Sequence, residues 1–106
     1  MHPLTPWAAR GADPAALVEA VAAALDGSGP ALAPLAAAGP APAPLAGSRP
    51  ELPGEVPDGV AAVVATSGST GRPRGVMLGA EALLASARAT HGRLGGPGRW
   101  LLALPI

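Results

Sequence analysis

The sequence predicts an α/β fold, and features of its second half carry that prediction. The continuous apolar run Val60–Ala65 is rich in valine and predicts a strand buried on both faces. A loop of glycine and hydroxyl residues follows, and Gly75–Leu78 then predicts a second short strand. Ala80–Leu94 has helical spacing of apolar residues, and Trp100–Leu104 is apolar enough for another buried strand. Strand, loop, strand, helix and strand in this order are typical of an α/β sheet.

The first half of the chain contains one well-marked helix, predicted over Asp13–Asp26. Asp13 can cap the free amides, and Pro14 suits the first helical position because it loses no hydrogen bond there. Gly27 follows as a stop signal. The apolar residues recur at helical spacing, at Leu17, Val18, Val21 and Leu25. Ala31–Leu35 is then expected to be a short strand.

Residues 36–58 are alanine, proline and glycine with a few charges, which indicates an irregular connector. We therefore predict two regions: 1–58, with the N-terminal helix and the Pro/Ala-rich connector, and 59–106, the start of a nucleotide-binding domain. The chain stops directly after a strand that resembles a central one. The expectation is an incomplete domain, truncated at the C-terminus.

Composition limits the classes of function. Alanine supplies much of the apolar content, and with two Trp and no Phe or Tyr the core is expected to be weak. The net charge is zero, which favours neither nucleic acid nor an acidic membrane surface as a partner. No cysteine is present, so disulfides and thiolate metal sites are excluded, and no metal centre is expected. No signal peptide or membrane-inserting helix is predicted, and the expected location is the cytoplasm.

The loop between the first two predicted strands of the second region combines the groups that a polyphosphate requires. Small residues let backbone amides approach phosphate oxygens closely, hydroxyls add donors, and Arg74 adds a fixed positive charge with forked geometry. A lysine-dependent Walker loop is excluded because the sequence has no lysine, and the dinucleotide glycine pattern lacks its third glycine. A simple Gly/Ser hinge is the alternative. The predicted phosphate-binding residues are Thr66, Ser67, Gly68, Ser69, Thr70, Gly71 and Arg74.

Val63–Val76 resembles the signature loop of the adenylate-forming (AMP-binding) enzymes, with Arg74 where lysine is commoner. The resemblance implies an N-terminal, incomplete part of the large adenylate-forming domain. It also implies that the loop holds the β- and γ-phosphates of ATP while a carboxylate attacks the α-phosphorus. CoA then displaces AMP to form a thioester. ATP, CoA and a small carboxylic acid are thus the implied substrates, and Mg²⁺ is implied with ATP.

Within that superfamily, the short segment before the loop resembles the o-succinylbenzoate–CoA ligases of menaquinone synthesis. Ala24–Pro30 and Ala89–Pro105 are also similar to those enzymes. The alternatives are a fragment of another acyl-CoA ligase, a fragment of a peptide-synthetase adenylation domain, or a non-catalytic remnant that binds ATP phosphates.

Several features of the family are missing from these residues. The family's catalytic lysine has no counterpart because the chain contains no lysine, and its ATP-ribose aspartate and C-terminal domain would lie beyond Ile106. No catalytic residue is assigned, and the 106 residues alone are expected to be inactive. A truncated product, a split gene and an assembly fragment all remain open, as do the acid substrate and the oligomeric state.

Overall fold

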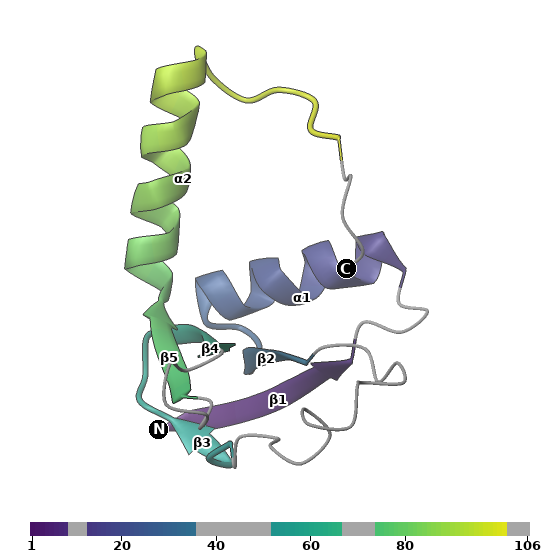
Figure 1. Ribbon diagram of the computed structural model, residues 1–106, viewed down its shortest axis with the longest axis vertical. Helices are drawn as coiled ribbons and strands as arrows, with labels where there is room; N and C mark the ends of the chain where they lie inside the picture. Colours follow the sequence, from purple (N-terminus) through teal and green to yellow (C-terminus); the bar gives the residue numbers. More distant parts are fainter. Residues whose placement is uncertain (9–12, 36–51, 67–73, 102–106) are drawn as a thin grey trace.

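The computed structural model describes residues 1–8, 13–35, 52–66 and 74–101, and it has the mixed α/β architecture that the sequence predicts (Figure 1). The strands of this part of the chain form one sheet in the order β3-β1-β2-β4-β5. In chain order the elements are β1 (His2–Ala8), α1 (Pro14–Asp26), β2 (Ala31–Leu35), β3 (Glu55–Val56), β4 (Val60–Thr66), β5 (Arg74–Gly79) and α2 (Ala80–Leu94).

The first three elements form a β-α-β unit in which β1 and β2 pair in parallel. Helix α1 begins as predicted: the carboxylate of Asp13 accepts a hydrogen bond from the backbone N–H of Ala15 at 3.1 Å, and Pro14 is the first helical residue. The helix ends at Gly27, whose φ of 79° is left-handed and is readily adopted only by glycine.

Strand β1 was not predicted, because Pro3 and Pro6 interrupt it and proline cannot donate a ladder hydrogen bond. In the structure β3 pairs with β1 only at His2 and Pro3. Where the chain is described, the rest of that side of β1, which includes Pro6, has no strand neighbour, and such an edge-like position tolerates proline. Strand β3 itself lies within the predicted connector, whose residues 36–51 are outside the described part.

The core consists of small clusters on the two faces of the sheet. On the face that α1 covers, Ala24 of α1 packs with Leu32 and Ala61, and Trp7 lies against them. The second cluster contains Leu4, Ala31, Ala33, Val56 and Val63. Half of the eight buried apolar residues in the described part are alanine, so the core is as light as the composition predicts.

Strand β4 is buried less completely than predicted. Ala61 and Val63 are 2% and 3% exposed, but Val64 is 38% exposed. Ala65 is exposed as well, and side chains alternate between the faces of a strand, so beyond Val63 the described end of β4 is open on both faces. The prediction of burial on both faces is therefore wrong for this end, because the cover given by α1 reaches Ala61 but leaves Val64 open.

Helix α2 follows β5 without a linker and has the predicted bounds. The N–H of Ala80 donates to the carbonyl of Gly59 at 2.8 Å, which ties the start of α2 to the turn before β4. The helix closes at Gly95, which is left-handed, and the N–H of Gly96 donates to the carbonyl of His91 at 2.7 Å. Beyond its first turns α2 stands away from the sheet (Figure 1).

Helix α2 is only partly covered along its length. Leu83, Leu84 and His91 are half-buried, while Ala87 and Leu94 are exposed. The predicted strand at 100–104 is not formed over Trp100 and Leu101, which are exposed and lie in no strand, and 102–104 is outside the described residues. In the part of the chain described, neither helix has the length and apolar character that crossing a membrane requires.

Polar contacts fasten the start of β1 to the start of β4. The Met1 ammonium group lies 2.8 Å from the Asp58 carboxylate, and His2 Nε2 donates to the carbonyl of Val60 at 2.9 Å. The hydrogen bond from the Met1 ammonium group, followed by its positive charge, lowers the pKa of Asp58 below its ordinary value. These contacts join the first residues of the chain to the turn from which β4 begins.

The turn between α1 and β2 leads to a first test. Gly29 donates its N–H to the carbonyl of Ala23 at 2.9 Å, and a β-carbon on Gly29 would lie 2.8 Å from that of Ala23. We expect Gly29→Ala to lower the free energy of unfolding by about 1–3 kcal/mol through overpacking. Gly54→Ala is the matched control, because a β-carbon there meets nothing within 4 Å. Equal urea midpoints for the two variants would contradict this packing.

Asp58 gives a second test, in the pH dependence of stability. A carboxylate whose pKa is lowered by folding stabilises the folded state above its unfolded pKa of about 4, and that contribution is lost as the pH falls through the folded pKa. We expect Asp58→Asn to lower the melting temperature at about pH 6 and to flatten its decline between roughly pH 5 and pH 3. Glu19→Gln, on the exposed side of α1, is the control. Parallel melting curves for Asp58→Asn and the wild type would refute the contact.

Candidate phosphate-binding site

The predicted phosphate loop connects the two antiparallel strands β4 and β5. The last pair of this hairpin joins Thr66 to Arg74, so the two ends of the loop are held side by side. Opposed residues in antiparallel strands have α-carbons roughly 4.5–5.5 Å apart. Of the predicted site residues, the structure therefore brings Thr66 and Arg74 together. Ser67, Gly68, Ser69, Thr70 and Gly71 lie outside the described residues.

The mouth of the hairpin lies at the edge of the sheet where ligands are usually bound. Strands β1, β2 and β4 are mutually parallel, so their carboxyl ends meet at one edge. Thr66 is the last residue of β4 and stands at that edge. In open α/β sheets, ligands bind beyond the carboxyl ends of the parallel strands. The two ends of the hairpin, Thr66 and Arg74, therefore lie at this edge of the sheet.

A β-bulge sets the register of the hairpin. Val60 pairs with Gly79, but the next pair joins Ala62 to Leu78, so Ala61 is an extra residue on β4. The register then continues without interruption to Thr66 and Arg74. A slip of one residue reverses the face of every later side chain. The bulge therefore determines on which face Arg74 lies, and nothing in the Val-Ala-Ala-Val sequence signals it.

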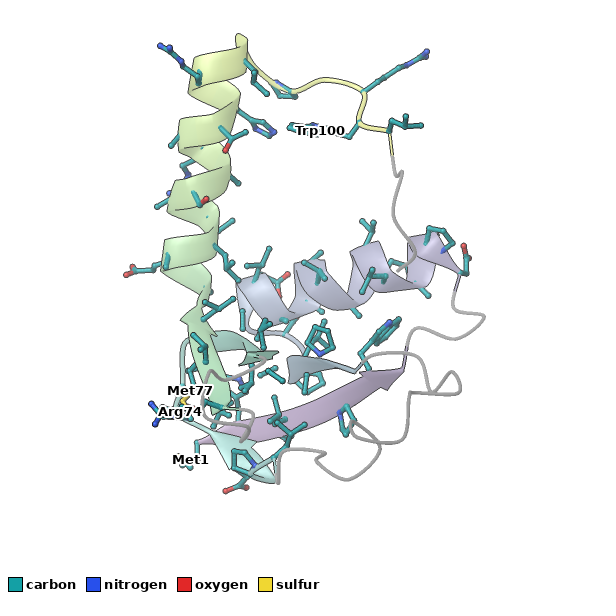
Figure 2. All side chains as sticks on the ribbon, in the orientation of Figure 1. Met1, Arg74, Met77 and Trp100 are labelled. Atoms are coloured by element: carbon teal, nitrogen blue, oxygen red, sulfur yellow. The ribbon has the colours of Figure 1, made fainter. Side chains whose placement is uncertain are left out.

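Arg74 is the positively charged residue of the predicted site, and it lies in the described part of the chain. It begins β5 and is exposed, and Figure 2 shows its side chain at that end of the strand. A guanidinium group stays charged at all physiological pH values, and its planar fork of N–H donors matches phosphate oxygens. A guanidinium group at the mouth of the hairpin has the charge and the donor geometry that suit an anion.

Two hollows of the described surface lie away from the hairpin mouth. One lies between the end of α2 and Trp100, and another lies between His2, Asp58 and Ala80. Neither is lined by Thr66 or Arg74. The described residues that mark the predicted site are therefore those at the two ends of the hairpin, Thr66 and Arg74.

Comparison with known proteins shows which family this chain resembles. The family model of AMP-binding enzymes matches residues 8–106, which is nearly the whole chain. The sequence is also 65% identical over 51 residues to the "Probable 2-succinylbenzoate–CoA ligase" of two strains of Mycobacterium tuberculosis, CDC 1551 / Oshkosh and H37Rv. That match covers 48% of this chain and 13% of each mycobacterial protein.

A further relative is the nonribosomal peptide synthetase malG of Malbranchea aurantiaca. It is 50% identical over 44 residues, which are 42% of this chain and 2% of the synthetase. The chain thus corresponds to a small part of each of these relatives. No solved structure matches it with comparable significance.

Proposed function

We propose that this chain, which belongs to the AMP-binding enzyme family, supplies the ATP-phosphate clamp of an acid–CoA ligase. The observation that carries the proposal is the β4–β5 hairpin, which holds Thr66 opposite Arg74 at the carboxyl edge of the sheet. Between these two residues the sequence provides the glycines and hydroxyls that a polyphosphate requires.

The proposed reaction has two steps. A carboxylate oxygen of the acid attacks the α-phosphorus of ATP, the bond to the bridging oxygen breaks, and pyrophosphate leaves. The CoA thiolate then attacks the acyl carbon of the resulting acyl-adenylate, and AMP leaves as the thioester forms. The loop and Arg74 would hold the β- and γ-phosphates and offset the negative charge that develops on pyrophosphate.

The acid that we propose is 2-succinylbenzoate, which is named for the two mycobacterial relatives. The similarity to a peptide synthetase keeps an amino acid as the second candidate substrate. The relevant activity is that of the whole protein, because the match spans only 13% of the mycobacterial ligases. We propose that the 106 residues alone bind ATP without turnover, since they contain no lysine.

Mg²⁺ would accompany ATP as its counter-ion. In the described part of the chain, no group of three or more His, Cys, Asp or Glu side chains is arranged to hold a metal ion. We therefore assign no metal ligand to these residues, and the hairpin contributes donors and positive charge.

Replacing Arg74 tests the proposed function. Hydrogen bonds to charged groups contribute about 1.5–3 kcal/mol, so we expect Arg74→Met to raise the dissociation constant of ATP by roughly 10- to 100-fold. Isothermal titration calorimetry measures this constant. Arg74→Lys should retain most of the affinity, because lysine is the commoner residue at this place in the family. Arg88→Met, an exposed arginine of α2, is the control for a general loss of positive charge.

Two outcomes would count against the proposal: no measurable ATP binding by the wild-type chain, or equal binding by Arg74→Met and the wild type. In the whole protein, AMP release that depends on 2-succinylbenzoate would support the ligase. Pyrophosphate exchange that depends on an amino acid would instead favour the second candidate.

A further inference from the structure

We infer that Gly75 is a positioning residue for the phosphate clamp, because its missing β-carbon allows β5 to lie closely against buried Val63. The inference rests on the proposed function. Gly75 pairs with Ala65, in the register position directly beside the pair of Thr66 and Arg74. Its packing therefore acts on the hairpin one residue away from the mouth.

The requirement for glycine here concerns space. A β-carbon built on Gly75 would lie 3.1 Å from Cγ1 of Val63. That is closer than the separation of about 3.5–4.0 Å at which two carbon atoms attract best. The described glycines with positive φ are Gly27, Gly59, Gly95 and Gly96, so Gly75 has a backbone conformation that other residues can adopt. A side chain is therefore excluded by its neighbour and not by the backbone.

Val63 has little freedom to move away. It is 3% exposed and belongs to the cluster that contains Ala33 and Val56, both of which are fully buried. Valine is also stiff about χ1 because two carbon atoms branch from its β-carbon. An added methyl group on Gly75 would consequently be relieved by displacement of β5, which lies at the outer edge of the described sheet.

The next residues of β5 have no such restriction. Val76 and Met77 are 43% and 51% exposed, so changes to their side chains are accommodated in solvent. Gly75 is thus the position at which the first part of β5 rests on the core. Displacing it by a few tenths of an ångström would carry Arg74 away from its place opposite Thr66.

A cycle of variants tests this inference. A misplacement of 1 Å can cost about 100-fold in a preorganised site, so a few tenths of an ångström should raise the dissociation constant of ATP for Gly75→Ala roughly three- to tenfold. Removing the obstructing atom with Val63→Ala should restore affinity, and the double variant should bind ATP within about twofold of Val63→Ala alone. Val76→Ala, the neighbouring exposed position, is the control and should bind as the wild type does.

Unfolding midpoints are measured for every variant, because a merely structural role would change stability without this pattern of rescue. If Gly75→Ala does not fold, the double variant must fold and bind ATP for the inference to stand. Unchanged binding by Gly75→Ala, or weakened binding that Val63→Ala does not restore, would overturn it. Arg74→Met separates the two ideas: if it still loses ATP while Gly75→Ala does not, the proposed function survives and the positioning role fails.

Discussion

The pairing of β4 with β5 is the constraint on which the rest of this structure depends. It holds the two ends of the loop at Thr66 and Arg74, and it joins the parallel unit of β1, α1 and β2 to helix α2. Its register begins at a bulge at Ala61 and is seated on the core at Val63. Because the side chains of a strand alternate in direction, one register fixes the faces of all its residues together.

The light core makes backbone contacts unusually important in this chain. Alanine buries little area, and among the described residues the largest side chain that is fully buried is Val56. Close approaches such as those at Gly29 and Gly75 are compatible with a core of this kind, in which strands and helices meet over small side chains. The contacts of Met1 and His2 with the Asp58–Val60 turn add polar fastening where apolar burial is small.

Local signals made both helices predictable. The ends of α1 are marked by Asp13, Pro14 and Gly27. Helix α2 ends at Gly95, and the helical spacing of apolar residues extends over its whole length. Strand β1 could not be predicted because it contains two prolines, and whether a strand tolerates proline depends on its place in the assembled sheet. The bulge and the exposed face at Val64 depend on packing between segments distant in the sequence. For the site, the sequence predicted a strand on either side of the loop, and the structure pairs Thr66 with Arg74 at the facing ends of those strands. Residues 67–73 lie outside the described part, and their role in binding phosphate stays a prediction.

The direct junction between β5 and α2 has a mechanical consequence. A helix of 15 residues is a rod roughly 22 Å long, and here it continues from the strand with no connecting segment. The bond from Ala80 to Gly59 anchors the base of this rod to the turn that precedes β4. A displacement of the far end of α2 would therefore be transmitted along the helix to its anchored base, where β5 ends. A rotation of the helix would either change the backbone angles of Gly79, the residue at which β5 meets α2, or move strands β4 and β5.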